Sequence, residues 1–187
     1  DQFVIQHFLG SEQLGVYSLA TRLVEGAFLL PAAALASIMG YLVVSGDKNE
    51  VFLYSLFFLA STVIALFLGF FGFFYIDLVL GAPYAEAVWP LLILSLCLPF
   101  TALRVINGKF LILHNLQMHS LYRSLISLVV NLVLSVILVQ WLGIIGVALA
   151  TLITVILASL FVDFISLKTK PFYAKKVQAI SDCFSKD

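Results

Sequence analysis

The sequence predicts an all-α protein whose helices form a polytopic transmembrane bundle. Hydrophobic residues make up 63% of the 187 positions, and charged residues make up only 11%. A soluble domain has about 45–50% apolar and about 25% charged residues, and it needs those charges to cover its surface. The few charges of this chain are also far apart, so that they leave long uncharged segments between them. This composition excludes a soluble enzyme, a disordered chain and a disulfide-stapled secreted domain.

The chain begins in an apolar segment that we interpret as the end of a helix. It opens at Asp1 without a methionine, and Phe3, Val4 and Ile5 follow without the basic region or the cleavage site of a signal peptide. We therefore expect residues 1–9 to be the end of a sixth transmembrane helix, in a protein that is longer than this chain.

Uncharged stretches predict five complete transmembrane helices, at about residues 14–45, 51–75, 86–112, 120–140 and 144–167. A helix needs about 20 apolar residues to cross about 30 Å of hydrocarbon. The stretches 26–46 and 51–76 carry no charge, and the uncharged stretch 87–103 continues as an apolar pattern to Leu113. A β-barrel is excluded because the apolar residues of these stretches occupy both odd and even positions.

The longest uncharged stretch, residues 124–162, is expected to fold into two helices. As one helix it would be about 58 Å long, which is about twice the thickness of the hydrocarbon layer. The segment Gln140-Trp141-Leu142-Gly143 marks the break, because it joins a polar residue, an interfacial aromatic residue and a glycine. Beyond the last helix, residues 168–187 form a basic tail.

Basic residues occur in alternate connections, which predicts the orientation of the bundle. Lys or Arg residues occur in loop 46–50, connection 109–123 and tail 168–187. They are absent from loops 10–14, 76–85 and 141–143. Because basic connections stay on the cytoplasmic side, we expect a cytoplasmic C-terminus and an external loop 76–85. The lysines of the tail either enforce this topology or bind anionic lipids.

Four charged residues of the expected helices are candidate binding residues. Arg22 and Glu25 are three positions apart and therefore share one face of a helix. Such residues usually face a bundle interior or a watery cavity, although this pair can also form an ion pair at the outer interface. Arg104 and Lys109 either bind an anion near the cytoplasmic mouth or extend their long side chains to the inner headgroups.

Small and polar residues indicate how the helices pack. Ser127, Asn131 and Ser135 recur every four positions, and we expect them to hydrogen-bond between helices, with substrate contact as the alternative. Gly146 and Ala150 form a pair of small residues that favours close approach of two helix backbones.

No motif for covalent chemistry or cofactor binding occurs in the sequence. Cys97 lies in an apolar stretch and Cys183 in the polar tail, so we expect two free thiols, and the three histidines lack the spacing of metal ligands. Nucleophile motifs, paired catalytic carboxylates and phosphate-binding loops are also absent. We therefore expect a transporter without a cofactor or a nucleic-acid partner, and not an enzyme.

Several segments together resemble the bacterial polysaccharide flippases, which transport O-antigen or capsule repeat units. Residues 1–25 (DQFVIQHFLGSEQLGVYSLATRLVE) resemble the family pattern D-x-x-x-I-x-x-F-x-G-x-x-x-x-G-x-Y-x-x-A-x-R-L-x-E. Residues 80–87 (LGAPYAEA) resemble the outer loop before the tenth helix of the family. Asn131 with residues 143–151 (GIIGVALAT) resembles the pattern N…G-I-x-G-A-A-x-A-T, with Val147 at a position that is often alanine. The match corresponds to the second half of a twelve-helix protein, from the end of helix seven through helix twelve.

The resemblance implies a location in the bacterial inner membrane and a function in the synthesis of surface polysaccharide. Such flippases move an undecaprenyl-diphosphate-linked oligosaccharide from the inner to the outer leaflet, and they have two six-helix halves around a cavity that opens alternately to each side. The implied partners are the lipid-linked oligosaccharide, membrane lipids and the N-terminal half of the same protein. The family pattern includes Asp1, Arg22 and Glu25, whereas Arg104 and Lys109 are candidates from this sequence alone.

Three other functions are compatible with the sequence. A drug or cation antiporter of the related multidrug-and-toxin extrusion carriers would use buried carboxylates, for which Asp1, Glu25 and Asp163 qualify. A membrane-embedded glycosyl- or acyltransferase, or a polysaccharide polymerase, would usually have a large outer loop or clustered His, Asp and Arg residues. A non-transporting scaffold would use Arg22 and Glu25 as a structural pair.

Overall fold

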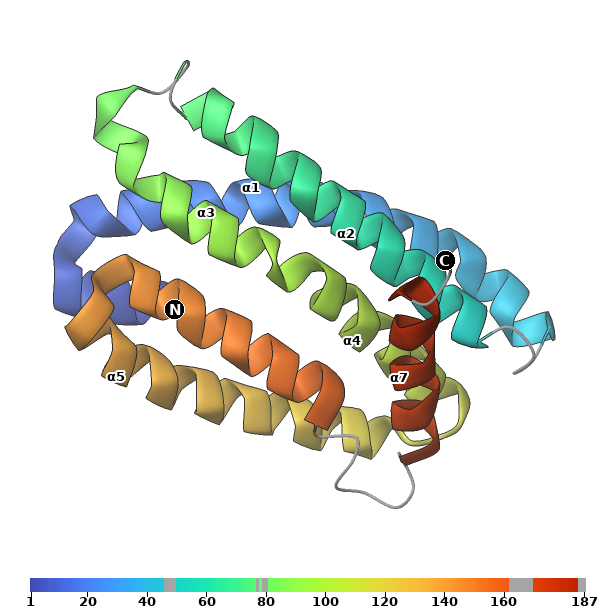
Figure 1. Cartoon of the computed structure of the whole chain (residues 1–187). Helices are drawn as coiled ribbons and strands as arrows, with labels where there is room; N and C mark the ends of the chain where they lie inside the picture. Colours follow the sequence, from blue (N-terminus) through green and yellow to red (C-terminus); the bar gives the residue numbers. More distant parts are fainter. Residues whose placement is uncertain (46–49, 77, 79–80, 162–169, 185–187) are drawn as a thin grey trace.

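The computed structural model describes residues 1–45, 50–76, 78, 81–161 and 170–184, and this part of the chain is all-helical. The elements, in chain order, are α1 (Gln2–Ser45), α2 (Glu50–Tyr75), the 3-10 helix η3 (Ala82–Ala87), α3 (Val88–Ser95), α4 (Cys97–Leu113), α5 (Gln117–Ile156), the π-helix η4 (Leu157–Phe161) and α7 (Lys170–Phe184). The predicted all-α class is confirmed, and no strand occurs within the described ranges. Figure 1 shows that the long helices lie side by side as a bundle.

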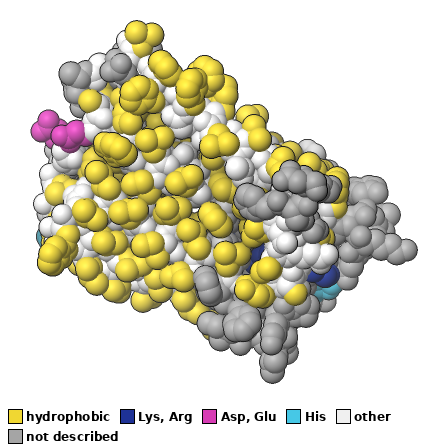
Figure 2. Space-filling model, in the orientation of Figure 1, with side chains coloured by type: hydrophobic (Ala, Val, Ile, Leu, Met, Phe, Trp, Pro, Cys, Tyr) yellow, Lys and Arg dark blue, Asp and Glu magenta, His cyan; other side chains and the backbone are white. Residues whose placement is uncertain are grey.

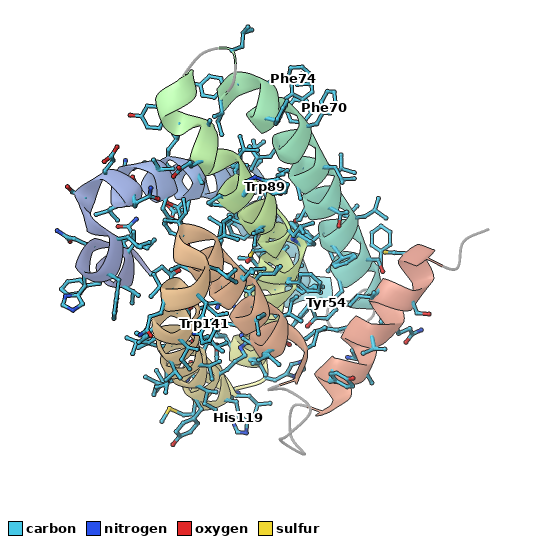
Figure 3. The ribbon with its side chains drawn as sticks, turned by 60° about the vertical axis from the view of Figure 1, so that its left-hand side comes forward. Tyr54, Phe70, Phe74, Trp89, His119 and Trp141 are labelled. Carbon is cyan, nitrogen blue, oxygen red and sulfur yellow. The ribbon has the colours of Figure 1, made fainter. Side chains whose placement is uncertain are left out.

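The surface of the bundle is apolar along its long helices. Four segments are long and apolar enough to cross a membrane, namely Gln2–Ile38, Val51–Tyr75, Tyr84–Leu113 and Gln117–Leu160. Hydrophobic side chains cover most of the face shown in Figure 2, while the acidic side chains visible there lie at one edge. In Figure 3, Phe70 and Phe74 point away from the bundle at the far end of α2, and both are exposed. Such a surface is suited to lipid rather than to water.

Two glycines with positive φ reverse the chain. Gly10 has a φ of 88° within α1, and Gly143 has a φ of 58° within α5. Glycine adopts this conformation without the steric cost that a Cβ atom adds. Figure 1 shows the chain turning at both places, so that α5 consists of two arms, residues 117–142 and residues 144–156. The second reversal lies at the break predicted at residues 140–143.

The two arms of α5 pack closely because residue 146 has no side chain. A Cβ atom on Gly146 would lie 2.2 Å from the carbonyl oxygen of Leu138 in the first arm. This distance is far below van der Waals contact, so only glycine fits between the arms. The small residue that the sequence singled out at position 146 therefore has a direct packing role within one hairpin.

Two buried clusters form the core. The first joins α1, α3 and the second arm of α5 through residues such as Tyr17, Leu94 and Val147. The second joins α2, α4 and α7 and contains Tyr54 and Ala179. Tyr54 donates a hydrogen bond of 3.1 Å from its hydroxyl to Oδ1 of the fully buried Asn107, which fastens α2 to α4.

The basic tail contains a helix that packs on the bundle. Helix α7 lies against α2, where the Ser55 hydroxyl donates a hydrogen bond of 3.2 Å to the carbonyl oxygen of Ala179. The Lys176 ammonium is fully buried and donates a hydrogen bond of 2.7 Å to the carbonyl oxygen of Ser159 in η4. One tail lysine therefore has a structural partner inside the protein. Lys168 and Lys186, which the sequence placed in the same tail, lie outside the described residues.

Candidate functional site

A cavity of about 310 Å³ lies between α1, the α3–α4 pair and the second arm of α5. Most of its wall is apolar, as expected inside this bundle. Its polar lining consists of Asp1, Tyr17, Thr21, Glu25, Thr101, Arg104 and Thr151. Charged and polar side chains therefore meet in a space between helices that are long and apolar enough to cross a membrane. Ionisable residues in such a place commonly mark substrate or ion paths.

Helical spacing explains which side chains reach the cavity. On α1, Tyr17, Thr21 and Glu25 recur every four residues and so share one face. On α4, Thr101 and Arg104 are three residues apart, and on the second arm of α5 Thr151 lies one turn before the apolar lining residue Val155. The polar lining residues of each of these helices thus lie along one stripe of that helix.

The carboxylate of Asp1 connects both arms of α5. Asn131 Nδ2, in the first arm, donates a hydrogen bond of 2.9 Å to Asp1 Oδ1. Thr151 Oγ1, in the second arm, lies 2.9 Å from Asp1 Oδ2 and also 3.0 Å from the carbonyl oxygen of Val147. The Ser135 hydroxyl donates to Asn131 Oδ1 at 3.0 Å and extends the network away from the cavity.

Only part of the predicted polar stripe on α5 joins different segments. Asn131 bonds to Asp1 as described above. Ser135 bonds to Asn131 in its own helix, and the Ser127 hydroxyl donates to the carbonyl oxygen of Arg123 at 2.8 Å, also within α5. The expectation of hydrogen bonds between segments therefore holds for Asn131 and is wrong for the two serines, because a serine side chain is short enough to bond to the preceding turn of its own helix.

Three of the five predicted binding residues line the same cavity, namely Asp1, Glu25 and Arg104. Arg22 is exposed and does not line it. The reason is rotational, because each residue turns a helix by about 100°. Arg22 is thus about 100° from Thr21 and about 60° from Glu25, beyond the edge of the stripe that faces the cavity. Neither a hydrogen bond nor an ion pair joins Arg22 to Glu25 in the part of the chain that the structure describes. Lys109 is half-buried farther along α4 and also lies outside the cavity lining.

Sequence reasoning did not identify Arg123 as a residue near the site. It counted Arg123 among the basic residues of the connection 109–123, although that range overlaps the helix expected at about 120–140. The structure shows α4 continuing to Leu113 and α5 beginning at Gln117. Arg123 lies in the second turn of α5, is only 3% exposed, and donates a hydrogen bond of 3.3 Å from Nη2 to the carbonyl oxygen of Arg104. Arg123 directly precedes an uncharged stretch. Counting uncharged positions therefore places the residue at the end of that stretch, but the count does not show where the helix begins.

Sequence reasoning also missed the uncharged polar residues Tyr17, Thr21, Thr101 and Thr151. These residues are uncharged, so an analysis that locates helices and sites from charged residues does not detect them. Their signal is periodic, since Tyr17 and Thr21 precede Glu25 by two turns and by one turn. A search for polar residues that share the helix face of each charge within an expected helix would have found Tyr17 and Thr21.

The charged and hydroxyl groups that line the cavity are of kinds that bind ions. Within the described ranges, no group of three or more His, Cys, Asp and Glu residues is placed to hold a metal ion. Around Asp1, the carboxylate and hydroxyl oxygens are the kinds of donor that a hard cation or a proton takes. Arg104 also lines the cavity, and its guanidinium is a planar set of donors suited to a carboxylate or a phosphate. Cys97 and Cys183 are free thiols, as predicted.

No protein-family model, curated protein or solved structure matches this chain. The likeness to polysaccharide flippases therefore rests on the sequence patterns of residues 1–25, 80–87 and 143–151. The structure adds a charged cavity inside an apolar helical bundle.

Proposed function

We propose that this chain is the C-terminal half of a transporter that moves a polyprenyl-diphosphate-linked oligosaccharide across the bacterial inner membrane. The observation that carries the proposal is the cavity, in which Arg104 faces a space enclosed by apolar helices. Arginine binds phosphate oxygens with a planar pair of donors, and such a contact is strong where water is scarce. A lipid-linked diphosphate presents such oxygens at the membrane interface.

The state of Arg104 supports a role in binding an anion. Arg104 and Glu25 line the same cavity, but no ion pair joins them in the part of the chain that the structure describes. An incoming diphosphate therefore meets the guanidinium without first displacing a carboxylate. Glu25 then helps to release the anion, because a negative charge in the same cavity opposes tight binding.

The two chain reversals support five complete spans and the end of a sixth. Gly10 divides the segment Gln2–Ile38, and Gly143 divides the segment Gln117–Leu160. The two divided segments give four helices, and Val51–Tyr75 and Tyr84–Leu113 add two more, which makes six. The first of them, before Gly10, is short. We assign the α7 end to the cytoplasm, because the basic connections of the sequence lie on that side.

A second candidate function is a cation-coupled antiporter, and the environment of Asp1 favours it. Two of the three charged residues that line the cavity are carboxylates, Asp1 and Glu25. Asp1 is also held by Asn131 and Thr151, as an ion-binding carboxylate is commonly held by its neighbours. The third carboxylate considered for this role, Asp163, lies outside the described residues.

Lipid-linked sugars from a deletion strain provide the test. If the chain belongs to a flippase, loss of the protein stops surface polymer, and complete lipid-linked repeat units accumulate in the inner leaflet. The measurement is extraction of these lipids together with an assay of their sidedness, and complementation with Arg104→Ala restores far less polymer than complementation with Arg104→Lys. Normal arrival of repeat units in the outer leaflet refutes the proposal. Normal polymer with raised drug sensitivity favours the antiporter, and an incomplete sugar chain favours the transferase.

A further inference from the structure

The buried side chain of Arg123 contacts the main chain of Arg104, the residue whose guanidinium lines the cavity. Arg123 Nη2 donates a hydrogen bond of 3.3 Å to the carbonyl oxygen of Arg104, 19 positions earlier in the sequence. The Arg104 side chain lines the cavity, while its carbonyl oxygen lies on the side of α4 that faces the first arm of α5. Arg104 therefore faces the cavity with its side chain, and it contacts Arg123 through its backbone carbonyl oxygen.

A glycine one turn farther along α4 gives Arg123 room to reach this oxygen. Gly108 lies four residues after Arg104, so the two residues share a face of the helix. A Cβ atom on Gly108 would lie 3.5 Å from Arg123 Nη2 and 3.8 Å from Ser120 Oγ. An alanine therefore just fits, whereas the branched side chain of valine would enter the space that the guanidinium occupies.

The α4–α5 hairpin is fixed at its turn as well as at this contact. The connection is short, and the Leu116 amide donates a hydrogen bond of 2.7 Å to the carbonyl oxygen of Leu111, while Asn115 has a φ of 59°. Arg123 adds a second link two turns away from that connection. These two links join α4 to α5 at the turn and at the Arg104 carbonyl oxygen, and so restrict rotation of α4 relative to α5.

We propose that Arg123 is a positioning residue that aims the guanidinium of Arg104 into the cavity by holding the carbonyl oxygen of Arg104. The inference rests on the proposed function, because it assigns Arg104 the task of binding the anionic group of the substrate. Arg123 itself does not line the cavity and acts through α4. A buried arginine is costly in a membrane bundle, and ionisable residues in that position commonly have a functional task.

A double-mutant cycle tests this inference, because the acceptor is a main-chain atom. Arg104→Ala removes the cavity guanidinium and leaves the carbonyl oxygen to which Arg123 bonds. The probe is inorganic diphosphate, and its binding to the purified full-length protein is measured by calorimetry, with the thermal unfolding midpoint recorded for each variant. We expect Arg104→Ala to weaken binding at least about tenfold and Arg123→Gln about fivefold, with part of the affinity kept in Arg123→Lys. The double variant should bind no more weakly than Arg104→Ala alone.

Two further variants separate positioning from general damage. Gly108→Val disturbs the contact from the α4 side without changing any charge, so it should lower diphosphate affinity as Arg123→Gln does, while Gly108→Ala should not. Lys175→Gln removes a cation of α7 that does not line the cavity and should leave the affinity unchanged.

The outcomes distinguish this inference from the proposed function. If Arg104→Ala binds diphosphate as tightly as the unmodified protein does, Arg104 is not the anion-binding residue of the proposed function. The positioning role of Arg123 is then wrong as well. If Arg104→Ala weakens binding but Arg123→Gln changes only the unfolding midpoint, the positioning role alone is wrong. Additive losses of affinity in the double variant also overturn it, because they would show that Arg123 acts independently of Arg104.

Discussion

At the residue scale, the carboxylate of Asp1 accepts hydrogen bonds from both arms of α5. Asn131 and Thr151 each bond to one of its oxygens at 2.9 Å. Hydrogen bonds to a charged acceptor are roughly twice as strong as those between neutral groups, and they gain further strength where the surroundings are apolar. These contacts therefore secure three segments that are distant in the sequence, and they also shape one end of the cavity.

Replacement of Thr151 by valine should destabilise the protein through this carboxylate. Thr151→Val keeps the shape of the side chain but removes the hydroxyl between Asp1 and the carbonyl oxygen of Val147. We expect a loss of about 1.5–3 kcal/mol, as is typical when a charged group loses a hydrogen bond. The measurement is the free energy of unfolding in detergent.

Thr62→Val is the matched control for this substitution. The Thr62 hydroxyl bonds to the carbonyl oxygen of Phe58 in its own helix, at 2.7 Å, and to no carboxylate among the described residues. Equal losses in the two variants would show that the contact with Asp1 contributes nothing to stability.

The positions of individual charged side chains show what the sequence can predict at the residue scale. Glu25 and Arg104 stand out because a charge in a long apolar stretch is costly, and both line the cavity. Arg22 stands out for the same reason but lies outside that lining. A three-residue spacing brings two side chains to neighbouring positions on one helix, but it does not show which of them faces a given neighbour. That choice depends on the packing of the other helices.

At the element scale, the hairpin of α5 depends on two glycines. Gly143 reverses the chain with a φ of 58°, and Gly146 then allows the second arm to pack against Leu138 of the first. The sequence predicted the break, since 39 uncharged residues are too long for one span and glycine with an interfacial aromatic residue marks the turn. It did not predict how closely the arms pack, because only the finished hairpin brings residue 146 beside residue 138.

Gly146→Ala should be destabilising even though alanine favours helices. The added Cβ atom would lie 2.2 Å from the Leu138 carbonyl oxygen and 2.6 Å from its carbonyl carbon, so the two arms must move apart. We expect a cost of about 1–3 kcal/mol, as for other overpacked sites, measured as a lower thermal unfolding midpoint. The control is Gly15→Ala in α1, where no heavy atom lies within 4 Å of the added carbon. Gly15→Ala should leave the midpoint unchanged or raise it, and a similar fall in both variants would contradict the packing argument.

The tail shows a limit of reasoning from composition at the same scale. Its lysines led to two expectations, a topology signal or a lipid-binding segment, and both place the charges in water or at headgroups. The structure instead buries Lys176 against Ser159, within a helix that packs on α2. Lysine has a long apolar stem, so a helix can bury the stem while the ammonium donates to acceptors inside the protein, of which the carbonyl oxygen of Ser159 is one. Composition does not show such a partner, because it becomes adjacent only after α7 packs.

At the scale of the whole molecule, charge and hydropathy are arranged along the bundle. The helices carry apolar side chains on their exposed surfaces, and Figure 2 shows the visible acidic side chains at one edge, with the visible Lys and Arg side chains toward the other end. The all-helical architecture and the apolar segments were predictable from composition, because few alternatives accommodate so little charge. The position of the cavity was not, because it depends on which stripes of three helices face one another.

Reporter fusions test the orientation of the whole bundle. A reporter that is active only in the periplasm should be silent when fused after residue 187, because we propose from the basic connections that this end of the chain is cytoplasmic. The same reporter inserted in loop 76–85 should be active. The measurement is reporter activity in cells, normalised to the amount of each fusion protein. Activity at the C-terminus together with silence in the loop would reverse the assigned orientation.

The hydrogen bonds of Asp1 also impose an order on biogenesis. Asp1 leaves the ribosome 130 residues before Asn131 and 150 residues before Thr151. At about 5–20 residues per second, the second of these partners follows after an interval on the order of 8–30 s. The carboxylate must therefore wait at the membrane, hydrated or held by the insertion machinery, until the last arm arrives. Closure of this network is thus a late event of membrane assembly, and a stalled chain that ends before Thr151 would leave the carboxylate without its second partner.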